Sequence, residues 1–317
     1  MIMCAVFGLI DYNSALSTKA KEKILKVLSK ECEARGTDAT GFAFNGGNHL
    51  TVFKRPQPAH KVKLRLPENT RVIMGHTRMS TQGSEKLNFN NHPFIGRTKE
   101  GSFALAHNGV LSNDELLRKS KGIPKPVIET DSYIAVQLLE QAGELSFESI
   151  RNMAEDVLGS FVFTILDDRD NVYFVRGNNP LCIYNFEYLG IYLYASTKEI
   201  LDRAVRKLGL ARLSKTEIPV SCGDILKIDS FGSITRSTFD SWGYLLGGFY
   251  DYDEERSFGG HQLQQLREFA RCFGLDEHVV DELYLYGYTA DEIEELLYEP
   301  EELANAINMI DYEELYC

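Results

Sequence analysis

The sequence predicts an α+β protein with two β-sheets and helices on their outer faces, followed by a small C-terminal helical appendage. Short apolar runs bounded by turn residues fall into two groups, before residue 110 and after residue 159, and helical patterns separate the groups. The charge balance changes near residue 240: residues 240–317 hold 20 Asp and Glu against 3 Lys and Arg, whereas residues 1–239 hold 26 against 31. We therefore expect the body and the acidic tail to be separate units.

The first group of elements opens with a strand over residues 4–11, which are apolar and rich in β-branched side chains. A helix follows over residues 17–32, where apolar residues recur at helical spacing. The later apolar runs are short and nearly uninterrupted, which is typical of strands buried on both faces. These predicted strands cover residues 41–44, 50–53, 71–76 and 103–107.

Two helices are predicted between the strand groups, over residues 130–142 and 146–158. Thr130 or Asp131 suits the N-cap of the first helix, because its side-chain oxygen can accept a hydrogen bond from a free backbone N–H. The second group of strands follows, with a hairpin turn at the polar run 167–171. Its predicted strands cover residues 160–166, 172–176, 182–186, 191–195 and 224–228.

The tail begins with a predicted linker, residues 243–260, that is rich in Gly, Tyr and acidic residues. Thr289 and Glu292 have the spacing of a capping box at a helix start. Residues 261–317 are expected to form an acidic helical domain, either a solvated surface or a docking surface for a partner. Nucleic acid is not expected as that partner, because phosphate contacts need basic groups. The predicted helices cover residues 261–273, 276–285 and 289–307.

Composition is that of an ordinary globular protein without a membrane segment. Of the 317 residues 44% are hydrophobic and 25% are charged, and no apolar run approaches the ~20 residues of a membrane helix. Residues 1–10 lack the layout of a signal peptide, so we expect a cytoplasmic location. The 6 cysteines and 7 histidines are scattered without metal-ligand spacing, and no metal site is expected.

The candidate nucleophile is Cys4, which lies almost at the start of the chain without a plausible base beside it in sequence. A cysteine nucleophile ordinarily needs a neighbouring general base or a lowered pKa. The free α-amino group of an N-terminal residue, with a reference pKa of about 8, can act as that base. The position of Cys4 therefore indicates a nucleophile that works as the first residue of a processed chain.

Two polar clusters contain an arginine. Arg35 lies in the run 35–41 between a helix and a strand, where the run could also be a helix-ending turn with Gly36 in the left-handed conformation. Arg78 follows a buried strand and begins a run of hydroxyl and amide groups that includes Thr81. An arginine there can bind the carboxylate of an amino-acid substrate through two hydrogen bonds, or it can form a surface salt bridge.

Two further clusters contain an amide and a carboxylate. Asn108 and Gly109 end an apolar strand, and the Asn amide with the Gly backbone N–H could hold an oxyanion during acyl transfer. The same dipeptide is common in tight turns. Asp131 lies at the start of a predicted helix, where it could cap the helix or bind the ammonium group of a substrate.

The order and spacing of these clusters after an N-terminal cysteine resemble the class II glutamine amidotransferase domains, which are N-terminal-nucleophile hydrolases. In particular, roughly residues 4–235 are similar to the glutaminase domain of glucosamine-6-phosphate synthases. The resemblance implies a four-layer αββα sandwich, with the amidotransferase domain over residues 4–242. It also includes the motifs Asn90-Asn91-His92-Pro93, Leu158-Gly159-Ser160-Phe161, Asn179-Pro180-Leu181, Tyr194-Ala195-Ser196 and Cys222-Gly223-Asp224-Ile225.

The resemblance implies a role for each candidate residue. Cys4 becomes residue one of the mature chain, its amine takes the thiol proton, and the thiolate attacks the side-chain amide of L-glutamine. Asn108 and the Gly109 N–H stabilise the oxyanion, and glutamate and ammonia are released without a cofactor. In addition, Arg78 with Thr81 binds the glutamine α-carboxylate, Asp131 binds the α-ammonium, Arg35 shapes the surroundings of the nucleophile, and residues 79–89 form a loop that closes over glutamine.

Three points stay open at the level of sequence. The ammonia is expected to pass to a separate acceptor protein through the acidic C-terminal region. Residues 1–3 must be removed, by a start at the third residue or by cleavage, before Cys4 has a free amine. The alternatives are a catalytically silent glutamine-binding or regulatory protein and a hydrolase of another γ-glutamyl amide. Arg78 and Asp131 disfavour substrates without a free amino-acid head, because a charge would stay unpaired in the pocket.

Overall fold

The structure is a computed structural model. It describes residues 4–47, 49–241 and 278–299, together with residues 266, 267, 270, 275, 276 and 302–307. The chain divides into two compact units between Ser241 and Trp242, and each is described by itself. Among the described residues, no helix is long and apolar enough to cross a membrane.

The first unit contains two β-sheets, and all of their strand pairings are antiparallel. The β1 sheet has the strand order β11 (Thr216–Glu217), β9 (Cys182–Phe186), β10 (Ile191–Ala195), β1 (Ala5–Asp11), β4 (Val72–Arg78), β2 (Ala39–Gly46) and β3 (His49–Arg55). The β6 sheet has the order β13 (Ile234–Thr238), β12 (Asp224–Ile228), β8 (Val172–Arg176), β7 (Gly159–Asp167), β6 (Ser102–Leu111) and β5 (Phe94–Arg97).

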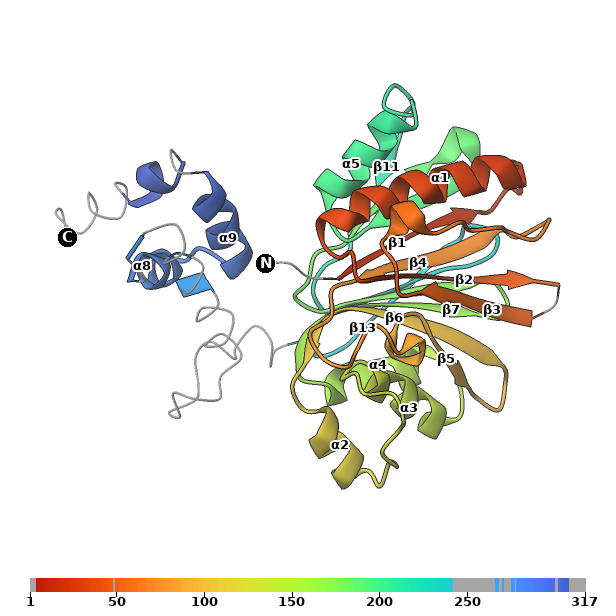
Figure 1. Cartoon of the computed structure of the whole chain (residues 1–317), viewed down its shortest axis with the longest axis horizontal. Coiled ribbons are helices and arrows are strands. Elements are labelled where there is room, and N and C mark those ends of the chain that lie inside the picture. The colour runs from red at the N-terminus through yellow and green to blue at the C-terminus, as the bar shows by residue number, and fades with distance from the viewer. Residues whose placement is uncertain are drawn as a thin grey trace. The chain divides into compact units, whose positions relative to one another are not determined.

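Helices cover the outer faces of both sheets (Figure 1). The β1 sheet carries α1 (Thr18–Glu31) and α5 (Lys198–Lys207), and the β6 sheet carries α3 (Tyr133–Ala142) and α4 (Phe147–Asp156). The connections contain α2 (Asp114–Ser120), η1 (Cys32–Ala34), η2 (Ala59–Lys61), η3 (Asn88–Asn90) and η4 (Glu187–Leu189). This order of helix, sheet, sheet and helix confirms the predicted αββα sandwich.

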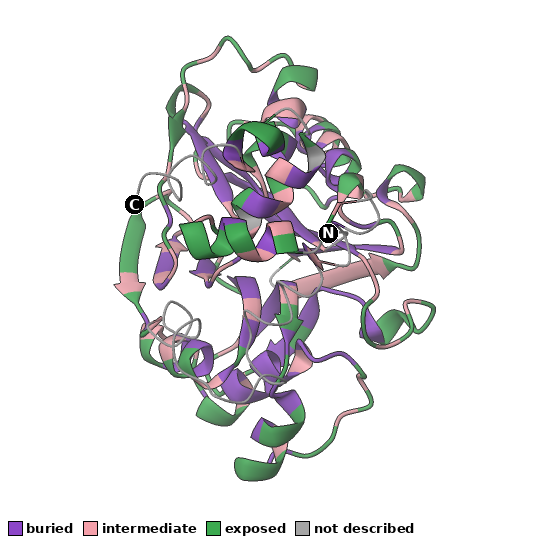
Figure 2. Ribbon diagram, turned by 90° about the vertical axis from the view of Figure 1, so that its left-hand side faces the viewer, coloured by how far each residue is buried: buried purple, intermediate pink, exposed green. Residues whose placement is uncertain are grey.

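Apolar side chains fill the space between the layers. In β1, Phe7 and Leu9 pack with residues of α1 and α5, whereas Val6 and Ile10 pack with residues of the β6 sheet. Burial on both faces explains why the central strands are unbroken apolar runs rather than alternating ones. Figure 2 shows the central strands in purple, as buried, between helices with exposed green surfaces, whereas strands at the sheet edges are pink or green.

Most of the predicted elements of the first unit are confirmed. The strands β8, β9, β10 and β12 have the predicted bounds. Ser17 caps α1 and Ser146 caps α4 through the side-chain oxygen. The N-cap of α3 is Ser132, whose side chain makes no capping hydrogen bond, so the predicted cap at Thr130 or Asp131 is wrong.

The structure also has elements where the sequence analysis predicts none, namely α2, α5, β5, β11 and β13. For α5 a signal was present in the sequence. Thr197 caps this helix by accepting a hydrogen bond from Ile200 N at 3.3 Å, and the apolar residues Ile200, Leu201, Ala204 and Val205 form its buried face. The other elements are short or lie at sheet edges, where apolar patterns are weak.

In the second unit, the described residues include α8 (His278–Tyr286) and α9 (Ala290–Tyr298). The predicted capping box of α9 is confirmed. Glu292 N donates to Thr289 Oγ1 at 3.3 Å, and Thr289 N donates to Glu292 Oε2 at 2.8 Å. The predicted linker over residues 243–260 and most of the predicted helix over 261–273 lie outside the described residues.

The predicted single helix over residues 289–307 is wrong. Its first part, α9, ends at Tyr298, and residues 302–307 are helical again. A proline disfavours helical backbone at the residue before it, and Glu299, which precedes Pro300, has a ψ of 83°.

Candidate active site

Cys4 lies directly before β1, next to the residues that follow β4. Strand β1 pairs with β4 so that Ala5 lies opposite Thr77. Beyond that pair, Met79 N donates a hydrogen bond to the Cys4 Sγ at 3.4 Å. Arg35 Nε donates to the Cys4 carbonyl oxygen at 3.1 Å. Both arginine clusters of the sequence therefore reach the cysteine.

The thiol of Cys4 is protonated at neutral pH. The residue keeps part of its surface exposed, but protein atoms surround the sulfur, and this burial raises the pKa of Cys4 to about 11. The Met79 N–H and the charges on Arg78 and Arg35 lower that pKa by less than burial raises it. Within the described residues, the hydrogen-bond partners of the sulfur are both backbone groups of Met79, and neither is a base.

Arg78 ends β4 and is 2% exposed, so its interpretation as a surface residue is wrong. Its Nη1 donates to Asn91 Oδ1 at 2.7 Å. Its Nη2 donates to the carbonyl oxygens of Gln82 and Gly83 at 2.6 and 2.9 Å. A guanidinium has five N–H donors, so Nε–H and one Nη1–H have no partner among the described residues and can bind a carboxylate.

The loop over residues 79–89 is anchored at both of its ends. Near its start, Ser80 N donates to Asp38 Oδ2 at 2.8 Å. Near its end, Asn88 Nδ2 donates to the Lys54 carbonyl oxygen at 3.1 Å. Thr81 lies between these anchors, exposed, and makes no hydrogen bond to another described residue. No hydrogen bond among the described residues therefore connects Thr81 to the other candidate residues.

Asn108 and Gly109 lie inside β6, opposite Val162 and Phe161 of β7, so the tight-turn interpretation is wrong. Gly109 has a φ of 142°, and a Cβ atom there would lie 1.9 Å from the carbonyl oxygen of Ser160. Only glycine fits this position. The Asn108 side chain is fully buried, and its Oδ1 has no hydrogen-bond partner in the described part of the chain.

Ser196 connects the Asn108 side chain to β1. Asn108 Nδ2 donates to Ser196 Oγ at 3.3 Å, and the same Oγ accepts from Val6 N at 2.9 Å. Because Val6 lies two residues after Cys4, this network joins the β6 sheet to the strand of the nucleophile. In the sequence, Ser196 stands out only as the last residue of the motif Tyr194-Ala195-Ser196. The available signal was a polar residue directly after the apolar strand β10.

Asp131 is buried and bonded to the same end of β6. Its Oδ2 accepts from Leu111 N at 2.6 Å, and Leu111 lies two residues after Gly109. Its Oδ1 accepts from Ser132 N at 2.7 Å and from Ser132 Oγ at 3.0 Å. The carboxylate therefore lies beside the strand end that carries Asn108 and Gly109.

Three buried histidines lie next to this strand end. His107 Nδ1 is 2.8 Å from the hydroxyl of Ser132, His76 Nε2 donates to the His107 carbonyl oxygen at 2.9 Å, and the His76 and His92 ring centroids are 4.3 Å apart. Burial lowers the pKa of His76 to about 3 and also lowers the pKa values of His92 and His107, so all three are neutral at pH 7. No cluster of ligand side chains among the described residues could hold a metal ion.

A helical segment, η1, does end at Arg35, but the backbone of Gly36 is not left-handed, so the left-handed conformation considered for it is wrong. A Cβ atom on Gly36 would lie 2.5 Å from the carbonyl carbon of Arg78. The neighbouring Asp38 N donates to the Arg78 carbonyl oxygen at 2.9 Å. Glycine is needed here because the end of β4 approaches the backbone closely.

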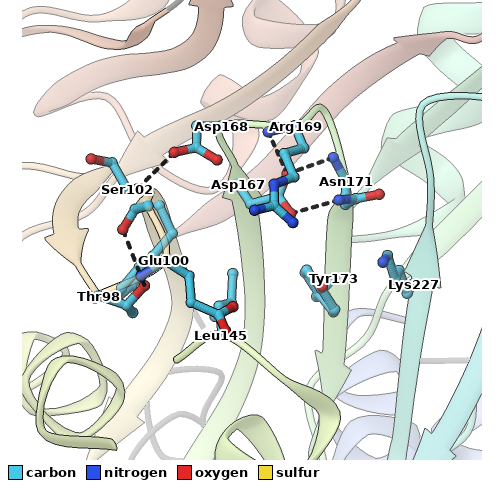
Figure 3. Close-up of a pocket in the computed structure, with 12 residues that line it drawn as sticks. Thr98, Glu100, Ser102, Leu145, Asp167, Asp168, Arg169, Asn171, Tyr173 and Lys227 are labelled. Atoms are coloured by element: carbon cyan, nitrogen blue, oxygen red, sulfur yellow. Dashed lines mark hydrogen bonds between the residues drawn. The ribbon is translucent and has the colours of Figure 1, made fainter. Parts of the chain in front are cut away.

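A separate hollow of about 190 Å³ lies at the other end of β6, beside Ser102 (Figure 3). Two of its three carboxylates, those of Asp167 and Asp168, already accept hydrogen bonds. Asp168 Oδ2 accepts from Ser102 N at 2.9 Å, and Asp167 Oδ1 accepts from the backbone N of Arg169 and of Asn171 at 2.9 and 2.8 Å. These contacts stabilise the predicted hairpin turn between β7 and β8, which the structure confirms.

The two antiparallel sheets, the outer helices and a cysteine directly before a central strand define an N-terminal-nucleophile hydrolase fold. The family model described as glutamine amidotransferases class-II matches residues 3–169, and the chain belongs to this family.

Relatives and a solved structure agree with this assignment. The chain is 34% identical over 189 residues to the glutamine--fructose-6-phosphate aminotransferase (isomerizing) of Bacillus cereus (strain ATCC 10987 / NRS 248), an alignment that covers 57% of this chain and 30% of the relative. It is 34% identical over 191 residues, with the same coverage, to the enzyme of that name from Staphylococcus aureus (strain Mu50 / ATCC 700699). The chain thus matches less than a third of the length of these relatives. The B. subtilis glutamine phosphoribosylpyrophosphate amidotransferase has a similar fold, with a TM-score of 0.58 and 20% identity, covering 84% of this chain and 58% of that chain.

Proposed function

We propose that the protein hydrolyses L-glutamine to glutamate and ammonia, with Cys4 as the nucleophile. The observation that supports this most is the hydrogen-bond network of Ser196, which joins the side chain of Asn108 to the strand that follows Cys4. Family membership supports glutamine as the substrate. The network supports acyl transfer because it holds a neutral N–H donor close to the strand of a thiol.

The α-amine of Cys4, free once residues 1–3 are removed, takes the thiol proton directly or through water. The thiolate attacks the side-chain amide carbon of glutamine, the ammonium returns the proton to the leaving nitrogen, and ammonia departs. Water activated by the same amine then hydrolyses the γ-glutamyl thioester to glutamate and regenerates the thiol. A pKa of about 11 for Cys4 makes such a base necessary at neutral pH.

The remaining candidate residues bind the parts of glutamine that do not react. The second Nδ2 hydrogen of Asn108 and the N–H of Gly109 are the proposed oxyanion donors. Arg78 has two unused N–H groups for the α-carboxylate, and Asp131 is the proposed partner of the α-ammonium. Arg35 positions the backbone of the nucleophile through the Cys4 carbonyl oxygen. Thr81 would have to move inward with its loop to contact the substrate.

We further propose that the ammonia passes to a separate acceptor protein, which docks on the acidic residues 240–317. The curated relatives are named aminotransferases, and this chain matches 30% of their length. Turnover of amide-labelled [¹⁵N]glutamine tests this step: the protein alone should release free ¹⁵NH₄⁺. Labelled nitrogen found in a product of the isolated chain would contradict a separate acceptor.

The test of the nucleophile is the intact mass of the protein before and after exposure to a glutamine-mimicking diazoketone, with ammonia release measured in parallel. We expect a chain beginning at Cys4, one covalent adduct, and turnover. Cys4→Ala should abolish both, whereas Cys222→Ala, which changes another partly exposed cysteine, should change neither. A mature chain that binds glutamine without an adduct would instead be a silent glutamine-binding protein. Turnover with residues 1–3 still attached would exclude the terminal amine as the base.

A further inference from the structure

A cationic groove, here the α1 groove, lies on the outer side of α1 and shares no residue with the candidate active site. It is a cavity of about 430 Å³ between α1 and the segment 59–66, which begins with η2. Its basic lining residues are Lys19, Lys23 and Lys26 from the helix and Lys61, Lys63 and Arg65 from the segment. Of its lining residues only Glu22 is acidic.

The sequence spacing explains why these charges face one another. Lys19, Lys23 and Lys26 recur at intervals of four and three residues, so they share one face of α1. Lys61 is the last residue of η2, and the backbone is extended at Val62, which follows it. Lys63 and Arg65 occupy alternate positions after Val62, and in extended backbone alternate side chains point to the same side. The groove therefore has two rows of cations, one on each wall.

Two glutamates fix the segment against the helix. At one end, Glu33 Oε1 accepts from the backbone N of His60 at 2.6 Å. At the other end, Glu22 Oε1 accepts from Leu66 N at 3.1 Å. Backbone hydrogen bonds thus hold both ends of the outer wall, and the other oxygen of Glu22 lies 3.5 Å from Arg65 Nη1.

The lysines of the groove have no carboxylate of their own. Within residues 4–47 and 49–241, Lys19, Lys23, Lys26, Lys61 and Lys63 form no ion pair. Neighbouring like charges repel one another and create a positive potential that attracts an anionic ligand. The chain as a whole carries a net charge of −12, so this local excess of cations is contrary to its overall charge.

The floor of the groove is apolar. Val62 and Leu64 are half-buried and pack on the core between α1 and the β1 sheet, and Phe42 beneath them is 3% exposed. Single-stranded nucleic acids are commonly bound by stacking successive bases on exposed aromatic rings, and the lining residues of this groove offer one exposed ring, that of His60, which is bonded to Glu33. The floor instead suits aliphatic side chains.

We propose that the α1 groove binds an acidic amphipathic segment of a partner protein. The Asp and Glu side chains of that segment pair with the lysines of the two walls, and its apolar face covers Val62 and Leu64. Charge complementarity speeds the encounter and selects the partner, while the apolar floor adds contact area.

A fluorescein-labelled helical peptide with Glu on one face and Leu on the other tests the proposal by fluorescence anisotropy. We expect the full-length protein to bind it, and more weakly as ionic strength rises. Lys23→Glu with Lys63→Glu should weaken binding at least about tenfold, a loss of about 1.4 kcal/mol. The matched control is Lys119→Glu with Lys125→Glu, which makes the same charge change at exposed lysines outside the groove and should bind like the unchanged protein.

Other outcomes would overturn the proposal. They are absence of binding, equal losses in the groove and control variants, or a Glu/Ser peptide that binds as well as the Glu/Leu peptide. Inorganic polyphosphate that binds where the peptide does not would assign the groove to a phosphate polymer instead. If charge reversal on α1 unfolds the protein, Lys61→Gln with Lys63→Gln provides the same comparison without a change in the helix.

Discussion

At the scale of single residues, the hydroxyl of Ser196 orients the Asn108 side chain. It donates its hydrogen to the Val6 carbonyl oxygen at 3.4 Å and accepts from Val6 N at 2.9 Å and from Asn108 Nδ2 at 3.3 Å. Because its one hydrogen is already used, the hydroxyl can only accept from Asn108. This keeps Nδ2, rather than Oδ1, on the side of β1 and leaves the second Nδ2 hydrogen for an oxyanion.

Ser196→Ala should lower the kcat of glutamine hydrolysis roughly 10- to 100-fold, since misorienting an oxyanion donor costs somewhat less than removing it. The KM should change little, because the hydroxyl of Ser196 bonds to Val6 and Asn108 and not to Arg78 or Asp131, which are proposed to bind the amino-acid head. Steady-state ammonia release measures both constants.

Ser29→Ala is the matched control for this variant. Ser29 is also a buried serine, but among the described residues its hydroxyl bonds only to the Lys26 carbonyl oxygen of its own helix, at 3.3 Å. It should keep the kcat of the unchanged protein. A loss of kcat shared by both variants, or an effect of Ser196→Ala on KM alone, would contradict the orienting role.

The residue types identified the candidate site, but they did not predict the backbone conformation of its residues. Asn108-Gly109 has the composition of a tight turn, yet both residues lie inside β6. Gly36 has the position of a helix-ending glycine. Glycine is needed there for another reason: a Cβ atom would lie 2.5 Å from the carbonyl carbon of Arg78. In both cases the deciding contact comes from another strand.

At the scale of elements, a buried ion pair attaches α1 to the β1 sheet. Lys21 Nζ lies 2.9 Å from Asp11 Oδ2, with side chains 5% and 0% exposed, and it also donates to the Thr70 carbonyl oxygen at 2.7 Å. Asp11 Oδ1 in turn accepts from Ala15 N at 3.0 Å. The ammonium of Lys21 and the carboxylate of Asp11 therefore neutralise each other only while α1 is packed on the sheet.

Asp11→Ala should lower the free energy of unfolding by about 3–5 kcal/mol, because it leaves the Lys21 ammonium buried without its carboxylate. Urea unfolding measures the change. Glu217→Gln is the matched control, because it breaks the ion pair of Glu217 with Lys198. This pair is also 2.9 Å long, but its side chains are 48% and 58% exposed, so the free energy of unfolding should not change measurably. Equal losses would show that burial of the pair is unimportant.

The three buried histidines make stability depend on pH. The pKa of His76 is about 3 in the folded protein, against 6.5 for the ordinary side chain, so between these values the unfolded chain binds more protons. The contribution is complete above about pH 6.5 and is lost as pH falls, by at most about 1.4 kcal/mol per pH unit for each histidine. Urea unfolding between pH 8 and pH 5 should show this decline.

His92→Phe should reduce that pH dependence, because both ring nitrogens of His92 lack a hydrogen-bond partner among the described residues and its ring only packs against neighbouring rings. His49→Asn, at an exposed position, should leave the pH dependence unchanged. A decline that is identical in all three proteins would assign it to other groups.

At the scale of the whole molecule, the two units have separate apolar cores. In the second unit the core consists of Leu266, Ala270, Val280, Leu283, Ile293, Leu297, Leu303 and Ala306, and none of these residues belongs to the two core clusters of the first unit. Each unit therefore buries apolar surface on its own, which is the requirement for independent folding.

Residues 1–241 expressed alone should keep a cooperative thermal transition within about 4 °C of the corresponding transition in the full chain, and glutamine hydrolysis should be unchanged. Calorimetry and ammonia release provide the measurements. A chain of residues 1–233 is the control, because it lacks β13. The Thr238 carbonyl oxygen of β13 accepts a hydrogen bond from Arg151 Nε at 2.7 Å, so the shorter chain should be less stable. Unfolding of the 1–241 chain would place the acidic tail in the core.

The sequence alone was sufficient for most strands and for the fold class. Strands such as β8 and β10 have their predicted bounds because burial on both faces demands an unbroken apolar run, and turn residues mark its ends. Edge elements such as β13, which is exposed along most of its length, do not need an unbroken apolar run and were therefore not predicted. The family resemblance depended on polar residues at strand ends, which are visible in sequence by their contrast with the apolar runs.

Only the tertiary structure decided how those polar residues are held. Ser196 bonds to Val6, which lies 190 positions away in sequence, and to Asn108, which lies 88 positions away. Arg78 is buried by the loop that follows it and bonds to Asn91. Local periodicity reports whether a position is buried, because burial selects apolar side chains. It carries no information on which distant polar group will lie within hydrogen-bond distance, because the packing of the two sheets determines that pairing.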